Sequence, residues 1–255
     1  MNFNLLAHDI AQWMEAYARE AHADGYVVGL SGGIDSSVTA ALAANAMGAD
    51  RTLGVLMPCH SQPQDAEDAQ KVAEVLGIDA LTLSLCPVYD AFVDMLPTGP
   101  EMAYANIKPR LRMTTLYYLA QSRGYLVAGT GNKPEMMVGY FTKYGDGGVD
   151  IEPLGELYKH EVRGLARVLN IPDPVIERPP SAGLWPGQTD EGELGITYRE
   201  LDAILDAMAT GDPQPAPATT VERVKRMIAQ SAHKRTMPPS FPIDRTSSRC
   251  TPANA

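Results

Sequence analysis

Cysteine is scarce in this sequence, and the few cysteines follow no pattern of a disulfide framework or a metal site. The 255 residues include three, Cys59, Cys86 and Cys250, with no CxxC spacing and no grouping with histidines. An odd number of scattered cysteines is typical of thiols in a reducing compartment. Met1–Ile10 has no basic segment followed by an apolar core, and no apolar run is long enough to cross a bilayer. We therefore expect a soluble, cytoplasmic protein.

An excess of positive charge is also lacking. The formal net charge is −10, whereas a protein that binds nucleic acid normally presents a basic face. The composition thus disfavours nucleic-acid partners, but a small anionic ligand needs only a local cluster of positive groups. Because 45% of the residues are hydrophobic, the chain can bury a sizeable core, and we expect residues 1–255 to form a single domain.

Short apolar runs alternate with segments of helical periodicity in the first half of the chain. The first expected helix, around residues 6–21, ends at Gly25. This alternation predicts βαβ units and an α/β fold with three layers, in which helices cover a mostly parallel, doubly wound, Rossmann-like sheet. Ligands in such folds bind beyond the carboxyl ends of the strands, here the loops after Leu30, Met57 and Ala128. The expected strands are 26–30, 52–57, 78–83 and 125–128, and the expected helices after the first are 35–47, 63–76 and 101–122.

The second half of the chain predicts a helical C-terminal part. Helices are expected over 200–208 and 221–232, joined by a flexible, Pro-rich linker at about 210–219. Residues 172–192 are rich in Pro and Gly and predict a long loop, which serves either as a mobile lid over a reactive intermediate or as a static surface loop. The tail from about residue 238 is expected to be poorly ordered.

A loop of small residues between the first strand and the second helix is the sharpest local signal. Small residues let several backbone N–H groups converge on one anion, and the helix N-terminus adds positive potential. There is no Walker lysine, so this is not a P-loop NTPase. The expected phosphate-binding residues are Gly29, Leu30, Ser31, Gly32, Gly33, Ile34, Asp35 and Ser36.

Asp35 suggests the chemistry of this loop. A carboxylate beside phosphates is unfavourable unless a cation lies between them, so Asp35 indicates Mg²⁺ bridging to a pyrophosphate. The alternative is a tight turn in which Asp35 is an ordinary helix N-cap. The S-G-G-x-D-S sequence resembles the pyrophosphate-binding motif of the N-type ATP pyrophosphatases, which split ATP into AMP and pyrophosphate while adenylating an acceptor oxygen. This motif indicates the class of enzyme but not the substrate.

Further motifs narrow the resemblance. They are Asn106–Met113, Gly129–Glu135 (GTGNKPE), Gly139–Asp150 with its FTKYGD stretch, Leu157–Lys159, Pro180–Trp185, Gln188–Glu191 and His233–Arg235. Together with the phosphate loop, this ordered set looks like ammonia-dependent NAD synthetase over roughly residues 5–240. The resemblance implies an ATP-pyrophosphatase-type fold and ATP-dependent amidation of deamido-NAD (nicotinic acid adenine dinucleotide) to NAD, with AMP and pyrophosphate released through an acyl adenylate.

The resemblance also implies roles for individual residues. It implies Mg²⁺ on Asp35 and Glu135, a catalytic, phosphate-binding Lys159, and further ATP contacts from Thr130 and Ser181, where the family often has Thr in place of Ser181. It implies a homodimer with deamido-NAD near the subunit boundary. The implied deamido-NAD contacts are Arg110, Lys143, Asp150, His233 and Lys234. Taken singly, each of these charged residues is compatible with a solvated surface position.

Three points rest on reasoning from the residues. Arg110 and Arg112 point about 200° apart on a helix, so we expect only one to face the site and choose Arg110 from the motif. Asp146 is a candidate general base that removes the extra proton from ammonium. Only about 25 residues precede the first strand, which leaves no room for a glutamine amidase domain. We therefore expect ammonia to be the donor, either directly or from a separate glutaminase.

Two other functions remain open. One is a different ligase of the same class, such as GMP synthetase or a tRNA-modifying enzyme, although the acidic charge and the missing CxxC pair disfavour tRNA substrates. The other is a nucleotide-binding sensor without chemistry, which would not need the set Asp35, Glu135 and Lys159. Release of pyrophosphate separates a sensor from an enzyme, and the choice of acceptor separates the ligases.

Overall fold

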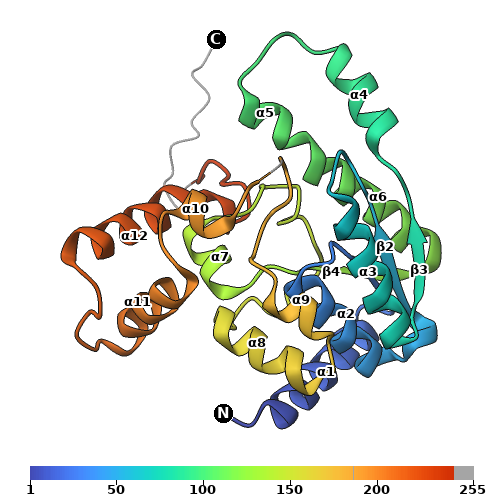
Figure 1. Cartoon of the computed structure of the whole chain (residues 1–255), viewed down its shortest axis with the longest axis horizontal. Helices are drawn as coiled ribbons and strands as arrows, with labels where there is room; N and C mark the ends of the chain where they lie inside the picture. Colours follow the sequence, from blue (N-terminus) through green and yellow to red (C-terminus); the bar gives the residue numbers. More distant parts are fainter. Residues whose placement is uncertain (186, 244–255) are drawn as a thin grey trace, which may run out of the picture.

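The computed structural model describes residues 1–185 and 187–243, and a four-stranded parallel sheet lies at its centre (Figure 1). The strand order is β3-β2-β1-β4, so β1 has β2 on one side and β4 on the other. The chain therefore builds outward from β1 and then returns to its other side. A crevice opens at such a switch point, at the carboxyl ends of β1 and β4. The strands are β1 Gly25–Gly29, β2 Thr52–Leu56, β3 Asp79–Thr82 and β4 Tyr125–Ala128.

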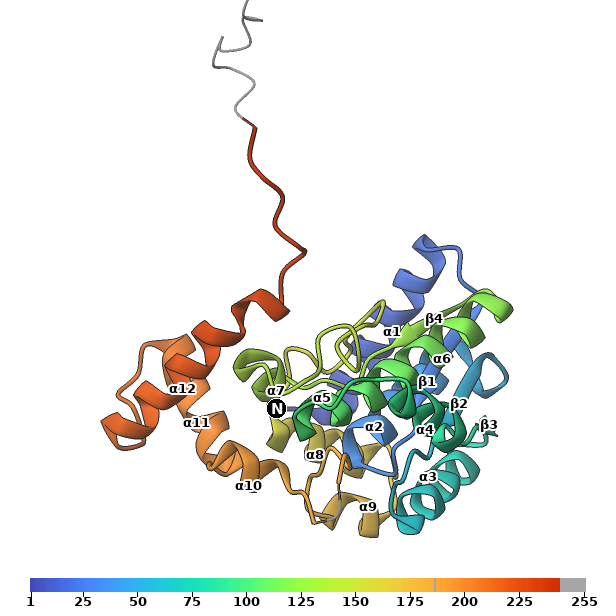
Figure 2. The same ribbon diagram turned by 90° about the horizontal axis from the view of Figure 1, so that it is seen from above.

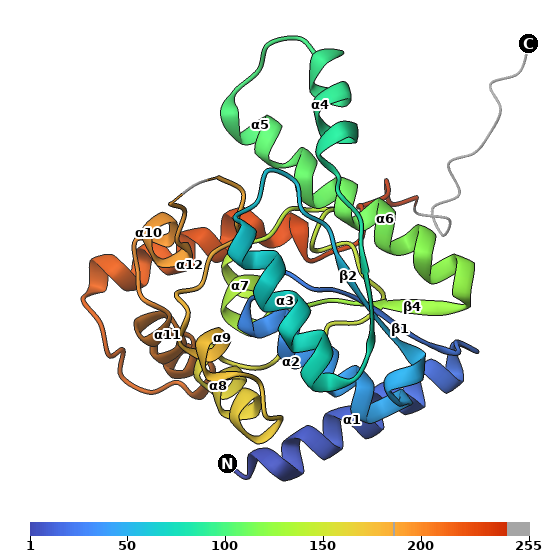
Figure 3. The ribbon, with the colours of Figure 1, turned by 45° about the vertical axis from the view of Figure 1, so that its right-hand side comes forward.

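Helices cover both faces of the sheet, as the sequence predicts (Figure 3). Tyr26 and Val28 pack into a core with α1, α2, α3 and α8, whereas Val27 between them packs into a second core with α6. Successive side chains of a strand point to opposite faces, so a strand buried on both faces becomes a continuous apolar run. The covering helices are α1 Phe3–Glu20, α2 Ile34–Met47, α3 Pro63–Leu76, α4 Cys86–Asp94, α5 Glu101–Ala105, α6 Ile107–Arg123, α8 Lys159–Val168 and α9 Asp173–Glu177, with a 3-10 turn at Ala49–Arg51.

The C-terminal helices, together with the short helix after β4, form a group to one side of the sheet (Figure 2). Val138, Leu201, Ile204 and Val224 belong to a separate apolar cluster in this group. Residues 236–243 follow without helix or strand. The helices of the group are α7 Lys133–Val138, α10 Asp190–Leu194, α11 Tyr198–Thr210 and α12 Ala218–Ser231, followed by a 3-10 turn at Ala232–Lys234.

The structure corrects the sequence-based helices in several places. Helix α4 was not expected. The helix expected over 101–122 divides at Asn106 into α5 and α6, and Pro109, which lacks a backbone N–H, falls in the first turn of α6, where no donor is needed. The segment 172–192 contains α9 and the start of α10, so its irregular part is shorter than expected.

Gly25 does not end the first helix, which stops at Glu20; it begins β1 instead. A Cβ at Gly25 would lie 2.2 Å from the Arg51 carbonyl oxygen, so close packing of two backbones requires glycine there. Over residues 1–185 and 187–243, no helix combines the length and apolar character needed for a bilayer crossing.

Candidate active site

The phosphate loop folds into a tight turn between β1 and α2. The Ser36 hydroxyl donates to the Gly33 carbonyl oxygen (3.0 Å) and accepts from the Ser31 backbone N–H (3.2 Å). The Ser31 hydroxyl oxygen accepts from the Gly33 N–H (3.2 Å). Gly32, between Ser31 and Gly33, has φ +78°. These bonds hold the loop in one conformation at the N-terminus of α2, where the first N–H groups have no partner within the helix.

Asp35, Glu135 and Lys159 meet beside this loop although they come from three separate elements. The Lys159 Nζ lies 2.6 Å from Asp35 Oδ2 and 3.2 Å from Glu135 Oε1. Asp35 belongs to the first turn of α2, Glu135 to α7 after β4, and Lys159 begins α8. The parallel sheet brings Asp35 and Glu135 together because the carboxyl ends of β1 and β4 are neighbours. Lys159 contacts both of them from the start of α8.

The electrostatics of this group favour a charged lysine. The Lys159 side chain is 1% exposed, and burial lowers its pKa, but the Asp35 and Glu135 carboxylates more than offset burial, so the pKa of Lys159 is raised. For Glu135, burial raises the pKa to about 7, Lys159 opposes this and Asp35 adds to it. The centre is thus a buried ammonium shared by two acidic groups.

Asn132 joins the two acidic side chains. Its side-chain amide donates to Asp35 Oδ1 (3.0 Å), and its backbone N–H donates to Glu135 Oε2 (3.3 Å). Asn132 also caps α7 by accepting from the Glu135 N–H (3.2 Å), which completes a capping box. The GTGN turn after β4 therefore fixes Glu135 relative to Asp35.

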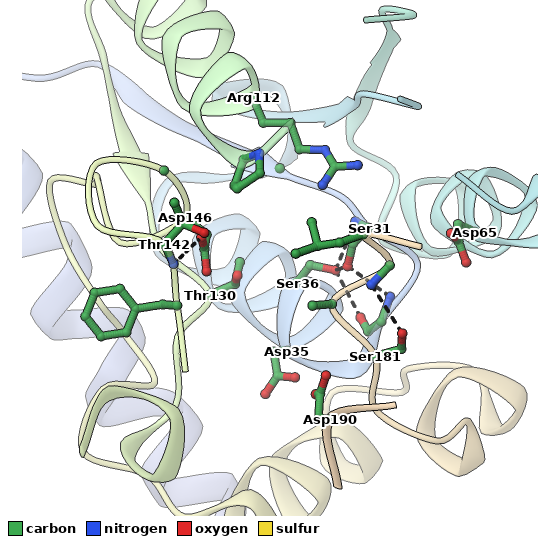
Figure 4. Close-up of a pocket in the computed structure, with 18 of the residues that line it drawn as sticks. Ser31, Asp35, Ser36, Asp65, Arg112, Thr130, Thr142, Asp146, Ser181 and Asp190 are labelled. Atoms are coloured by element: carbon green, nitrogen blue, oxygen red, sulfur yellow. Dashed lines mark hydrogen bonds between the residues drawn. The ribbon is translucent and has the colours of Figure 1, made fainter. Parts of the chain in front are cut away.

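A pocket of about 750 Å³ opens over this centre, a volume within the usual range for small-molecule sites. It lies beyond the ends of β1, β2 and β4, where the sequence predicted it, and Figure 4 shows Asp35 and Asp190 along one side of it. Of the predicted site residues, those lining the pocket are Gly29, Leu30, Ser31, Gly33, Ile34, Asp35, Ser36, Thr130, Glu135, Asp146, Ser181 and Lys234.

Several predicted residues lie behind the pocket wall or outside it. Gly32 packs against α3, and Lys159 lies behind the carboxylates that it contacts. Both Asp150 carboxylate oxygens accept internal bonds, from Tyr117 Oη (3.0 Å) and from the Val127 N–H (2.8 Å). Arg110, Lys143 and His233 do not line the pocket, and Lys143 donates to the His233 carbonyl oxygen. Their roles toward deamido-NAD stay predictions.

Of the two arginines on α6, Arg112 faces the pocket. The Arg112 side chain is drawn among the residues that line the pocket (Figure 4). Its guanidinium donates to the Met57 carbonyl oxygen (3.3 Å) and to the Ser61 hydroxyl (3.4 Å). Arg110 is exposed. The expectation that only one of them faces this site therefore holds, but the arginine that does so is Arg112. Packing of Leu111 and Leu116 on the sheet sets the rotation of α6, and this packing was not visible in the spacing.

The comparisons with known proteins agree over nearly the whole chain. The family model described as NAD synthase matches residues 6–238. The NH(3)-dependent NAD(+) synthetase of Carboxydothermus hydrogenoformans is 48% identical over 93% of this chain and 97% of its own length. That of Archaeoglobus fulgidus is 46% identical over 94% of this chain and 97% of its own length.

This chain belongs to the NAD synthase family.

Solved structures of related enzymes share the fold. NMN synthetase from Francisella tularensis matches with a TM-score of 0.89 at 38% identity, covering 95% of this chain and 100% of that one. The NH3-dependent NAD synthetase of Campylobacter jejuni, solved with nitrate, matches with a TM-score of 0.82 at 27% identity, covering 95% and 100%. The NAD synthase sheet and its flanking helices thus agree with the α/β fold predicted from the sequence.

Two side chains at the centre of this NAD synthase site were not predicted. Tyr198 donates from its hydroxyl to Glu135 Oε1 (2.7 Å) and contacts Asp190 Oδ2 (3.1 Å). Asp190 is 5% exposed, and burial raises its pKa. Asp190 belongs to Gln188–Glu191, one of the motifs that carry the family resemblance, and this motif could have identified it as a candidate. No local sequence signal distinguishes Tyr198.

Arg178 is a third residue at this site that was not predicted from the sequence. It pairs with Asp65 and Asp68 on α3, where the Asp68 contact is 3.2 Å, and it lines the pocket. These two ion pairs hold the segment after α9 against α3, which packs behind the phosphate loop. Lys108 holds the same segment further on, by donating to the Leu184 carbonyl oxygen (2.7 Å). The irregular segment is therefore anchored at two points in this structure.

Asp146 lines the pocket and is exposed, so small molecules can reach it. Its Oδ1 accepts from the Thr142 backbone N–H (2.9 Å). Surrounding protein reduces the hydration of the carboxylate and raises its pKa, although the Thr142 hydrogen bond opposes this. A carboxylate with a raised pKa accepts a proton more readily than an ordinary aspartate does, which suits the predicted role of a base.

Glu152 supports the GTG turn from behind. Its Oε2 accepts from the Gly131 N–H (3.1 Å), and a Cβ added at Gly129 would lie 2.3 Å from that oxygen. Burial raises the pKa of Glu152 to about 8, although the Gly131 hydrogen bond lowers it. The carboxyl group is therefore protonated over much of the neutral range in the folded protein and ionised in the unfolded chain.

We expect Glu152→Gln to change the pH dependence of stability. Because the pKa of Glu152 is higher in the folded protein, the free energy of unfolding of the wild type falls as pH rises. The fall begins above about pH 4.5 and is complete once pH has passed about 8. The Glu152→Gln side chain is neutral at every pH, so this fall is absent in the variant. Between pH 5 and pH 8, its free energy of unfolding should therefore gain roughly 1–3 kcal/mol relative to that of the wild type. Urea unfolding at both pH values measures this gain. Glu156→Gln is the control, because Glu156 is 91% exposed and should show no such trend; equal trends would contradict the assignment.

Proposed function

We propose that this chain catalyses ATP-dependent amidation of deamido-NAD by ammonia, giving NAD, AMP and pyrophosphate through an acyl adenylate. The observation that carries the proposal is the Asp35–Lys159–Glu135 centre beside a small-residue phosphate loop, in a member of the NAD synthase family. The relatives from Carboxydothermus hydrogenoformans and Archaeoglobus fulgidus are ammonia-dependent NAD synthetases. The chain covers nearly their whole length, which supports the same activity here.

The proposed ATP site is the phosphate loop together with Thr130, Lys159 and Ser181. The first step brings a carboxylate onto a triphosphate, so negative charge must be neutralised before the groups can react. Lys159 supplies a buried positive charge next to the loop. When ATP binds, we expect its ammonium to move from the two carboxylates to a phosphate oxygen.

Mg²⁺ fits the residues at this centre. The nearest oxygens of Asp35 and Glu135 converge on one cation, the Lys159 ammonium, at 2.6 and 3.2 Å. Carboxylate oxygens are the ligands that Mg²⁺ prefers, and it commonly takes one or two carboxylates plus substrate phosphates and waters. Over residues 1–185 and 187–243, no group of three or more His, Cys, Asp or Glu side chains suited to a metal is found. Bound Mg²⁺ would neutralise charge on the triphosphate.

The proposed deamido-NAD contacts are Arg110, Lys143, Asp150, His233 and Lys234. Lys234 lines the pocket, whereas Arg110 and Lys143 lie next to each other outside it, joined by a bond from the Arg110 guanidinium to the Lys143 carbonyl oxygen (3.4 Å). Basic groups both inside and outside the pocket suit a long ligand that leaves it. We further propose a homodimer, with residues 1–255 as one functional unit, in the cytoplasm, where Cys59 and Cys86 stay reduced.

For the second step, we propose Asp146 as the general base that converts ammonium to ammonia. Asp146→Asn should lower the amidation rate about 10²-fold at limiting ammonium near neutral pH, a usual magnitude for a lost base. The defect should shrink as pH rises, because free ammonia then becomes abundant. Glu156→Asn at an exposed site is the control. An unchanged rate at limiting ammonium would exclude Asp146 as the base.

The test of the proposed function mixes the protein with deamido-NAD, ATP, Mg²⁺ and ammonium, and follows NAD, AMP and pyrophosphate together. Equal amounts of the three products are expected. Nicotinic acid mononucleotide should be tested as a second acceptor, because the NMN synthetase of Francisella tularensis matches this fold over 95% of the chain. A preference for the mononucleotide would overturn the dinucleotide assignment, and AMP release with XMP alone would favour another ligase. No pyrophosphate with any acceptor would favour a nucleotide sensor.

A further inference from the structure

Helix α11 contacts Lys159 from behind the active site. It packs against α8, which begins with Lys159, and against α7, which carries Glu135. One face of α11 is apolar, and its Leu201, Ile204 and Leu205 belong to the C-terminal cluster. Another face carries Tyr198 and Asp202, four residues apart and therefore side by side on the helix. Both side chains are buried, at 1% and 5% exposure, and neither belongs to that apolar cluster.

Asp202 holds the backbone of Lys159. Its Oδ1 accepts from the Lys159 N–H (3.3 Å), and its Oδ2 accepts from the His160 N–H (3.1 Å) and contacts His160 Nδ1 (2.9 Å). These N–H groups lie at the start of α8, where they have no partner within the helix. A carboxylate at this position is also favoured by the helix dipole. Asp202 therefore fixes the point from which the Lys159 side chain leaves the backbone.

Tyr198 holds the other end of the same lysine. Its ring centroid lies 4.6 Å from the Lys159 Nζ, a cation–π distance. Its hydroxyl donates to Glu135 Oε1, one of the two carboxylates that contact the ammonium. Its backbone N–H donates to Glu191 Oε1 (2.9 Å), so Tyr198 is itself fixed. One helix thus contacts both the backbone and the ammonium of Lys159.

We propose that Tyr198 and Asp202 are positioning residues that keep Lys159 and Glu135 aligned for ATP and Mg²⁺. A lysine side chain has many rotamers, so an ammonium that must reach a phosphate benefits from a fixed backbone and a fixed resting place. When the ammonium moves to a phosphate, the Tyr198 hydroxyl still holds Glu135 in place as a ligand. Groups that orient such ligands typically contribute 10–100-fold to metal affinity or activity. The inference rests on the proposed ATP chemistry, but it does not depend on which acceptor is used.

The test compares Tyr198→Phe and Asp202→Asn with two controls. Tyr26→Phe removes the hydroxyl of an equally buried tyrosine that donates to the Met14 carbonyl oxygen (2.7 Å), far from the site. His160→Ala removes the third contact of Asp202 but leaves both backbone contacts. For each variant we measure the melting temperature, ATP binding by calorimetry in EDTA, kcat, KM for both substrates and the Mg²⁺ concentration that gives half activation.

We expect Tyr198→Phe and Asp202→Asn to lower kcat about 10-fold or more. Tyr198→Phe should raise the Mg²⁺ requirement, and Asp202→Asn should weaken ATP binding in EDTA, while KM for the acceptor stays within about twofold for both. Asp202→Glu, which keeps a carboxylate, should recover part of the loss. If both variants match Tyr26→Phe and His160→Ala in every measure except melting temperature, the inference is wrong. If Asp202→Asn fails to fold, Tyr198→Phe alone decides.

The two proposals fail in different ways. If the wild type makes no NAD, the proposed acceptor is wrong, yet ATP binding in EDTA still compares the variants with their controls. If the wild type makes NAD and the variants keep its ATP binding, kcat and Mg²⁺ requirement, only the positioning role is overturned.

Discussion

Replacing Lys159 with methionine should reduce turnover about 10²–10³-fold, the range for loss of one positioned group that stabilises charge in a transition state. The methionine keeps most of the side-chain volume but removes the ammonium that lies between Asp35 and Glu135. The two carboxylates then face each other in a buried site, and breaking such a buried pair by removing one partner costs about 3–5 kcal/mol. Burial already raises the pKa of Glu135, so uptake of a proton by this carboxylate reduces that penalty.

The same variant should respond to Mg²⁺ in a way that the wild type does not. In the wild type, the ammonium already occupies the point where the two carboxylates converge. Without it, Mg²⁺ can bind there in the absence of nucleotide, so Mg²⁺ should raise the melting temperature of Lys159→Met by several degrees and leave the wild type nearly unchanged. Lys133→Met on neighbouring α7 is the control, because Lys133 pairs with the exposed Glu156 at 3.4 Å. Turnover within about tenfold of wild type for Lys159→Met would contradict the assigned role.

Gly32→Ala is expected to unfold the phosphate loop, with loss of ATP binding. Gly32 has φ +78°, a conformation that costs other residues about 1–2 kcal/mol. A Cβ there would also lie 2.4 Å from the Asp65 carbonyl oxygen, which belongs to the backbone of α3 and cannot rotate away. We expect a loss of about 3 kcal/mol in stability, or roughly 6–12 °C in melting temperature, and at least about 10²-fold weaker ATP binding.

The adjacent glycine provides a matched control. Gly33 has φ −91°, and a Cβ there would meet only the Ser31 hydroxyl oxygen, at 3.3 Å. Gly33→Ala should therefore keep a melting temperature close to that of the wild type, even if the added methyl group hinders a phosphate. Thermal unfolding and calorimetric titration with ATP compare the two variants. Equal destabilisation by both substitutions would show that neither the backbone conformation of Gly32 nor its contact with α3 matters.

The fold could be predicted from the sequence because parallel strands buried on both faces become continuous apolar runs. The strands at Tyr26 and Val127 were recognisable in this way, and so was the position of the site at their carboxyl ends. The edge strand β3 is short and mostly exposed, yet it was still placed within a residue or two. Helix α4 was not predicted, and none of its side chains is completely buried in the structure.

The site was predictable only where its residues belong to motifs. Asp35, Glu135 and Lys159 follow recognisable strand ends or begin a helix, and the structure brings them into contact. Tyr198 could not be found in this way, because its contact with Glu135 joins residues 63 positions apart in the sequence. The rotation of α6, which turns Arg112 and not Arg110 toward the pocket, depends on packing that no local spacing records.

The order in which the chain is synthesised gives the α11 contacts a further consequence. The phosphate loop and the first three strands are complete by about residue 82, but Tyr198 and Asp202 emerge more than a hundred residues later. Contacts across such sequence separations form late, because a long loop must close before they contribute. A nascent chain that ends before α11 can therefore assemble much of the sheet while Lys159 still lacks the helix that holds its backbone. Until α11 has formed, the incomplete polypeptide lacks the contacts proposed to position Lys159 and Glu135.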